Sequence, residues 1–233
     1  DNSLSAYRQQ FPSNIISELT AGSQEGWSND GSAIESKLGS YFGRINYDFN
    51  NRYLFQANLR YDGSSKFARD KRWGWFPSFS AGWRIAEEPF MNDISWINEF
   101  KLRGSWGKLG NNRIGNYQYI PLIALGQNYN FGGTASSGAA QTSPTNPDIT
   151  WETTTEMDIG FDAGLFENQL SLTFDYYNRY TDDILTSVPV SDIYGLPAPT
   201  VNAGAMRNRG VEIEVAHNNN IRDFRYDLSL YGA

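Results

Sequence analysis

Tyr53-Leu54-Phe55-Gln56-Ala57-Asn58-Leu59-Arg60-Tyr61-Asp62 is the stretch that decides the fold of this chain of 233 residues. Its odd-numbered positions carry apolar or aromatic side chains, and its even-numbered positions from residue 56 onward are polar or charged. Because successive side chains of a β-strand point to opposite faces, the stretch predicts a strand with one apolar and one polar face. No helical period fits the same residues.

The same alternation returns in seven further segments, so the sequence predicts about eight strands. Two architectures are consistent with this pattern. One is a soluble antiparallel barrel or sandwich with its apolar face inside, and the other is a membrane barrel with its apolar face toward lipid. The seven segments span residues 41–49, 78–85, 100–106, 156–163, 170–177, 210–215 and 224–230.

The lengths of the connections favour the membrane barrel. Tight polar joints at residues 50–51 and 167–169 alternate with long joints at residues 110–148 and 182–205. Short turns at one rim and long loops at the other are typical of outer-membrane barrels, whereas long irregular connections are unusual in a compact soluble domain. We therefore predict an all-β fold, an antiparallel transmembrane β-barrel segment with short periplasmic turns and long extracellular loops.

Composition agrees with this prediction and excludes several other classes. The mean hydropathy is -0.54, and no run of about 18 apolar residues is present, which argues against a helical membrane protein. Cysteine is absent, which excludes a disulfide, a thiolate nucleophile and a sulfur-bound metal. Aromatic residues make up 15% of the chain, as expected for girdles at two membrane interfaces. The expected girdle positions are Tyr41, Phe49, Tyr53, Trp75, Trp106, Trp151 and Tyr176.

The charges point to a lumen lining rather than to a nucleic-acid surface. The net charge of -7 and the pI near 4.8 argue against nucleic-acid binding, which requires a basic surface. The basic residues are interleaved with carboxylates on the polar strand faces, which we interpret as a mixed-charge lumen. The residues predicted to face the lumen are Arg44, Arg60, Arg84, Arg103, Asp158, Asp175, Glu212 and Glu214.

An ordered set of motifs carries a family resemblance. Residues 60–67, Arg-Tyr-Asp-Gly-Ser-Ser-Lys-Phe, resemble the RxDGSSxF signature of the SusC/RagA family of TonB-linked outer-membrane transporters. The resemblance covers roughly residues 33–233. It continues in the family's order at residues 40–47 (SYFGRINY), 74–84 (GWFPSFSAGWR), 87–90 (EEPF), 102–107 (LRGSWG), 176–179 (YYNR) and 208–212 (NRGVE).

The resemblance implies a plugged barrel of about 22 strands that imports nutrients, such as glycans, oligosaccharides or peptides, with energy transmitted through TonB. It also implies a SusD-like surface lipoprotein as partner and the outer membrane of a Gram-negative, Bacteroidetes-like bacterium as location. We expect this chain to be an internal segment of the C-terminal barrel, with TonB engaged through a plug region outside it. Residues 1–32 are then an extracellular loop region, and residues 33–233 the barrel segment.

Aromatic residues in the long connections are candidates for contact with a ligand or a partner. Tyr117, Tyr119, Tyr129 and Phe131 lie among amide and hydroxyl side chains, and Tyr194 lies in the second long connection. Aromatic faces beside amides suit sugar or peptide recognition. The alternative is that these rings pack the loops against their neighbours or against a partner.

No catalytic, cofactor or metal site is expected. His217, the only histidine, follows a strand and precedes three asparagines in an expected turn, without a second imidazole or a cysteine. Glu212 and Glu214 share a strand face, where such residues more often line water than form an acid and base pair. Residues 62–65 are expected to form a turn in which Gly63 supplies a positive φ. A soluble carbohydrate-binding β domain, a small self-closed outer-membrane barrel and a fragment of a glycan-degrading enzyme remain as alternatives.

Overall fold

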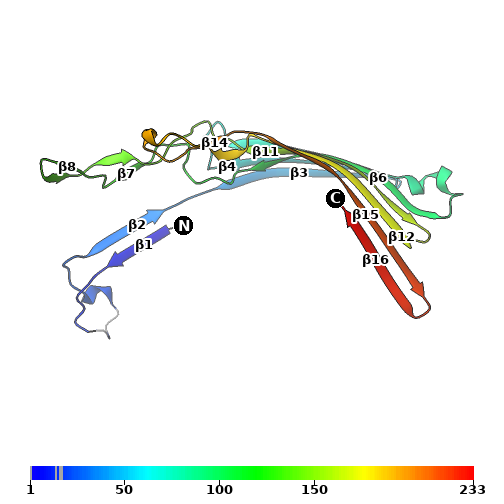
Figure 1. The fold of residues 1–233 in the computed structure, drawn as a ribbon, viewed down its shortest axis with the longest axis horizontal. Coiled ribbons are helices and arrows are strands. Elements are labelled where there is room, and N and C mark those ends of the chain that lie inside the picture. Colours follow the sequence, from blue (N-terminus) through cyan, green and yellow to red (C-terminus); the bar gives the residue numbers. More distant parts are fainter. Residues whose placement is uncertain (1, 14, 16–17) are drawn as a thin grey trace. The chain divides into compact units, whose positions relative to one another are not determined.

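The computed structural model of the chain describes residues 2–13, 15 and 18–233. Eight strands form one antiparallel sheet in the order β16-β15-β12-β11-β6-β5-β4-β3 (Figure 1). Each of these strands pairs with the one that follows it along the chain, which confirms the predicted eight-stranded antiparallel array. The strands are β3 (Leu38–Phe49), β4 (Tyr53–Ser64), β5 (Trp73–Arg84), β6 (Ile97–Asn111), β11 (Glu152–Leu165), β12 (Leu170–Asp182), β15 (Met206–Ile221) and β16 (Phe224–Gly232).

Short turns close the strand pairs at one end of the sheet, which we call the short-turn rim. Between β3 and β4, Asn50 and Asn51 have φ values of 53° and 56°, and the Asn51 N–H donates to Asp48 Oδ1 at 2.8 Å. Asparagine enters this left-handed region more readily than most residues, which is why it serves in such a turn. The joints after β11 and β15 are also short, at residues 166–169 and 222–223.

The opposite end of the sheet, the long-connection rim, carries the two long joints predicted from the sequence. These joints contain short strand pairs rather than irregular chain alone. None of the helices in the described residues is long and apolar enough to cross a membrane. The short elements are β7 (Ile123–Leu125) paired with β10 (Ala139–Gln141), β8 (Tyr129–Phe131) with β9 (Thr134–Ser136), β13 (Leu185–Ser187) with β14 (Thr200–Asn202), and η4 (Asp192–Tyr194).

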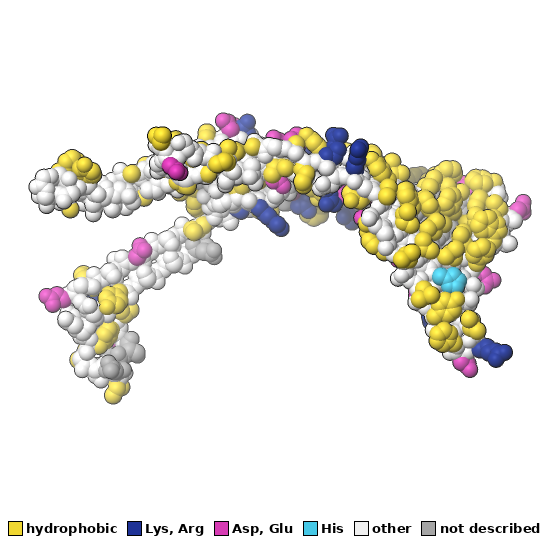
Figure 2. Space-filling model, in the orientation of Figure 1, with side chains coloured by type: hydrophobic (Ala, Val, Ile, Leu, Met, Phe, Trp, Pro, Cys, Tyr) yellow, Lys and Arg dark blue, Asp and Glu magenta, His cyan; other side chains and the backbone are white. Residues whose placement is uncertain are grey.

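Register gives the sheet one apolar face and one polar face. Phe174 on β12 lies opposite Phe161 on β11 and Ile213 on β15, whereas its neighbour Thr173 lies opposite Asp162 and Glu214. The apolar face is not covered: Tyr41 is 70% exposed and Leu230 is 73% exposed. Figure 2 shows hydrophobic side chains gathered over strands of the sheet. An uncovered apolar face of this extent marks a contact surface, which for a closed barrel is lipid.

Residues 1–37 form a separate compact unit. Within it, β1 (Asn2–Tyr7) pairs with β2 (Ser28–Ala33), and η1 (Leu19–Ala21) lies between them in sequence. The sequence predicted a loop region over residues 1–32 and did not predict this hairpin. Residues 1, 14, 16 and 17 of that region lie outside the described residues, and its extracellular location stays a prediction.

Two local predictions are wrong. His217 lies inside β15, opposite Leu170 and Leu228, and its ring stacks on Tyr226 at 5.5 Å. The run of asparagines after it continues the strand, and the turn follows at residues 222–223 instead.

Gly63 lies inside β4 rather than in a turn, and its φ is not positive. A Cβ at this position would lie 2.6 Å from the indole ring of Trp73. The glycine is therefore explained by the close approach of Trp73 and not by backbone conformation.

Candidate functional site

An arginine with three carboxylates occupies the middle of the polar face. Arg103 on β6 places Nη1 2.6 Å from Asp175 Oδ1 and 3.5 Å from Asp158 Oδ1, and its Nε lies 3.2 Å from Asp162 Oδ2. These carboxylates come from β11 and β12, so the group joins three neighbouring strands. One guanidinium thus faces three carboxylates, and Lys101 lies opposite Asp162 on the same face.

The remaining predicted lumen residues lie on the same polar face. The Nε of Arg44 donates to Asn58 Oδ1 at 2.6 Å, and Arg60 pairs with Asp62 at 3.1 Å. Arg84 pairs with Glu87 at 3.0 Å. Glu212 lies directly opposite Asp175, and Glu214 lies opposite Thr173. The structure thus brings all eight predicted residues to one face, and each of the four arginines has a polar partner.

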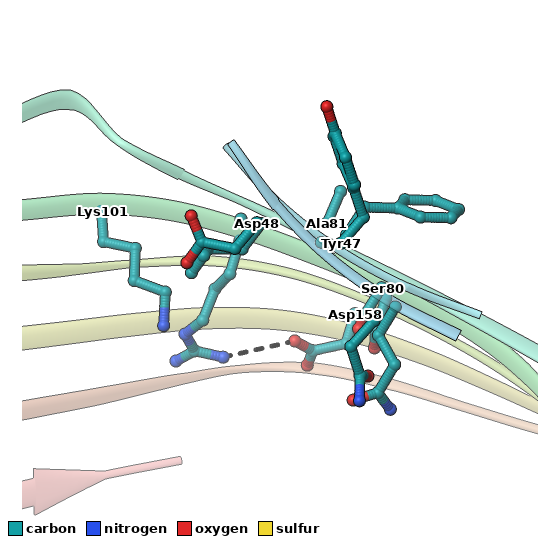
Figure 3. Close-up of a pocket in the computed structure, with 14 residues that line it drawn as sticks. Tyr47, Asp48, Ser80, Ala81, Lys101 and Asp158 are labelled. Atoms are coloured by element: carbon teal, nitrogen blue, oxygen red, sulfur yellow. Dashed lines mark ion pairs between the residues drawn. The ribbon is translucent and has the colours of Figure 1, made fainter. Parts of the chain in front are cut away.

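A hollow of about 510 Å³ lies over the polar face beside Arg103. In Figure 3, Lys101 and Asp158 lie on one side of the sheet, and Tyr47 points to the other. The hollow is lined by charged groups of both signs and by Ser80 and Gln56. It therefore offers both hydrogen-bond donors and acceptors to a polar ligand.

A small hydrophobic cluster packs segments of the long-connection rim against one another. Phe67, Phe76, Ile149 and Trp151 are its buried members, and we call them the mouth cluster. The ring of Trp151 lies 5.2 Å from Phe67 and 5.3 Å from Phe76, and its Nε1 donates to Arg72 O at 3.0 Å. Trp151 was predicted as a girdle residue in contact with lipid. That prediction is wrong, because the ring is buried between connections.

Hydrogen bonds fix the two longest connections to one another. The Nδ2 of Asn202 donates to Thr150 O and to Asp183 O, both at 2.9 Å, while its Oδ1 accepts the Thr150 N–H at 2.8 Å. Asn146 Nδ2 donates to Thr200 O at 3.0 Å. The base of both connections is therefore held in place by side chains.

The five candidate aromatic residues of the connections do not form a single site. Tyr119 packs against the mouth cluster. Tyr117 has φ 64° and lines a second hollow, of about 250 Å³, with residues 197–200. Tyr129 and Phe131 contact each other at 4.8 Å and are each 67% exposed, and Tyr194 is exposed on η4. Contact of any of them with a ligand stays a prediction.

A buried glutamate organises the short-turn rim. Glu88 lies between η2 (Ile85–Glu87) and η3 (Pro89–Met91), and its carboxylate accepts hydrogen bonds from Tyr53 Oη at 2.6 Å and Trp83 Nε1 at 3.0 Å. The Nη1 of Arg52 lies 3.5 Å from Glu88 Oε2. These hydrogen bonds and the charge of Arg52 lower the pKa of Glu88 against the opposing effect of burial. We call this group the Glu88 clamp.

Comparison with known proteins adds to this geometry. The family model described as TonB dependent receptor-like, beta-barrel, matches residues 2–233. The TonB-dependent receptor SusC of Bacteroides thetaiotaomicron is 39% identical over 204 residues, which cover 84% of this chain and 20% of that receptor. The TonB-dependent receptor P39 of Formosa agariphila is 39% identical over 184 residues, which cover 79% of this chain and 17% of that receptor.

Among solved structures, that of the RagAB peptide importer in the closed-closed state aligns with a TM-score of 0.79 and 26% identity. The alignment covers 99% of this chain and 26% of that one. The chain spans about a fifth of the length of the curated relatives that it matches.

Proposed function

The chain belongs to the TonB-dependent receptor-like β-barrel family, and we propose that it forms wall and mouth of a transporter importing glycans, oligosaccharides or peptides. Its strands are part of a barrel in the outer membrane, as in its relatives. The observation that carries the proposal is the two-faced sheet, with an uncovered apolar face and a polar face of paired charges. The polar face would line the lumen.

Two alternatives are less compatible with the same sheet. A soluble β domain would bury its apolar face, whereas here the buried hydrophobic cluster is confined to the long-connection rim. A self-closed barrel would pair the first and last strands, but β3 and β16 stand at opposite ends of the strand order. Unpaired strand edges are costly in lipid, so further strands would have to complete the wall.

The long connections suit the docking of ligand and partner. Their bases are fixed by the mouth cluster and by Asn202, while Leu125, Tyr129 and Phe131 present uncovered apolar and aromatic surface beyond. A SusD-like lipoprotein covering that surface is the partner that we propose. TonB would act through a plug region outside this chain. Since the relatives are named as receptors, we propose no catalytic role.

Uptake by the whole protein tests this function. A deletion strain complemented with the full-length gene should accumulate labelled oligosaccharides or labelled oligopeptides, and deletion of tonB should abolish that uptake. Tyr129→Ala with Phe131→Ala should weaken uptake, whereas Arg222→Gln at the opposite rim should not. Failure of both substrate classes to enter in a TonB-dependent manner would contradict the proposal.

A further inference from the structure

The connection between β4 and β5, at the long-connection rim, is rich in positive charge. Residues 65–72 contain four basic residues and a single acid, Asp70, although the whole chain carries a net charge of -7. Lys66 donates to Asn112 O at 3.4 Å. Among the described residues, Arg69, Lys71 and Arg72 enter no ion pair. The connection therefore holds three cations outside any ion pair, of which Arg72 has a buried Nε.

A ladder of aromatic rings lies next to this connection on the apolar face. Its members are Tyr41, Tyr61, Trp73 and Trp75, and we call it the aromatic ladder. Tyr61 stacks between Trp73 at 4.7 Å and Trp75 at 4.2 Å, and Tyr41 stacks on Trp73 at 6.0 Å. The ring of Trp73 also lies over Gly63. Aromatic belts of this kind mark the depth of the lipid headgroups.

Backbone hydrogen bonds close the connection directly before Trp73. The Ser64 N–H donates to Arg72 O at 3.1 Å, and the Lys71 N–H donates to Ala68 O at 3.0 Å. Phe67, fully buried in the mouth cluster, anchors the start of the connection. Arg69 and Lys71 lie in this compact segment, four and two residues before Trp73 of the ladder.

We propose that this connection and the aromatic ladder bind a phosphate-bearing lipid of the outer leaflet. The phosphates would lie against Arg69 and Lys71, and the acyl chains would run along the ladder. Guanidinium groups suit this role because they donate two parallel hydrogen bonds to phosphate. Cations beside a membrane surface also attract anionic headgroups. The proposal concerns the lipid around the barrel and does not depend on which nutrient is imported.

Native mass spectrometry of the whole purified protein tests the proposal, with bisphosphorylated lipid A as the probe and dephosphorylated lipid A as its comparison. The wild-type protein should retain the bisphosphorylated lipid through detergent exchange and lose the dephosphorylated one. The double variant Arg69→Gln with Lys71→Gln should weaken retention of the bisphosphorylated lipid by roughly tenfold or more, since each substitution removes one surface cation. It leaves Arg72, whose backbone carbonyl accepts the Trp151 hydrogen bond, in place.

The matched control is Arg222→Gln with Arg225→Gln, which removes the same charge from two cations at the short-turn rim. This variant should retain the lipid as the wild-type protein does. Equal retention of both lipids by the wild-type protein would overturn the proposal, whatever the variants do. So would an equal loss in the control variant, or competition by inorganic phosphate as effective as that by the lipid.

Discussion

The contribution of Arg103 to stability depends on its surroundings more than that of the other arginines of the polar face. Its side chain is 29% exposed and contacts three carboxylates, whereas the side chain of Arg44 is paired with the neutral amide of Asn58. Removing one member of a partly buried charge group leaves the other members desolvated without compensation. The same arginine side chain therefore contributes different amounts of stability at two positions of one face.

For Arg103→Gln in the whole transporter, we expect the free energy of unfolding to fall by roughly 2 to 3 kcal/mol, because hydrogen bonds to charged partners are lost. Urea unfolding in detergent micelles measures it. Arg44→Gln is the matched control and should cost less than about 1 kcal/mol. Equal losses in the two variants would show that the carboxylates around Arg103 add nothing.

Phe174 and Thr173 are neighbours that face opposite sides of the sheet. Phe174→Arg should cost about 2 to 4 kcal/mol, because it places a charge against lipid near the middle of a spanning strand. Thr173→Arg should be far milder, since Asp162 and Glu214 lie opposite it. Unfolding of the two variants in lipid vesicles compares them, and similar costs would refute the assignment of the faces.

The carboxylate of Glu88 makes the stability of the folded protein depend on pH. Because its pKa is lowered in the folded protein, its charge contributes stability above the ordinary glutamate pKa of about 4.3. That contribution is lost as the pH falls through the lowered value. The stability difference between wild type and Glu88→Gln should therefore shrink on acidification from pH 7 to pH 3. Glu87→Gln, which alters an exposed carboxylate paired with Arg84, should show little difference at either pH.

At the scale of elements, the strands were predictable and the packing between connections was not. Each strand repeats its own pattern every two residues, so the face on which Phe55 or Leu172 lies can be predicted from local sequence alone. Phe76 occupies a polar-face position of β5 and looks like an exception to the alternation. Its burial depends on Phe67, which lies in the preceding connection, and on Trp151, which lies far away in the sequence, and no local period connects either to it.

One sequence signal for the mouth cluster did exist. Gly74 and Gly110 leave room for the ring of Phe76, which a Cβ at either position would contact too closely. Glycines within strands often mark such close approaches. The sequence contains several other strand glycines, however, and only the fold reveals which of them face an aromatic ring.

Trp151→Ala should loosen both long connections together. The change removes a buried indole and the hydrogen bond to Arg72, with an expected cost of about 3 to 5 kcal/mol. Limited proteolysis of the whole protein in detergent should then cleave residues 112–151 and 183–205 faster than in the wild type. Phe131→Ala, at the exposed end of β8, is the control and should leave both cleavage rates unchanged.

At the scale of the whole molecule, the sheet is one part of a larger wall. β3 and β16 each have an edge without a strand partner in the described residues, and the apolar face is uncovered. Both features favour association with other strands and with lipid. The isolated chain of 233 residues should therefore aggregate without detergent, as size-exclusion chromatography will show. A monodisperse monomer in buffer would contradict the membrane assignment.

The two-residue alternation also determines where natural length variation can occur. Deletion of a single residue such as Ile159 would exchange the two faces of the remainder of β11 and turn Asp162 toward lipid. The short turn that follows β11, in which Phe166, Glu167 and Asn168 all have positive φ, is too tight to absorb such a shift in register. Insertions and deletions should instead accumulate at the tip of the β8–β9 hairpin, where Gly132 and Gly133 have positive φ. That tip is accordingly the place to insert an epitope tag for imaging the protein on living cells.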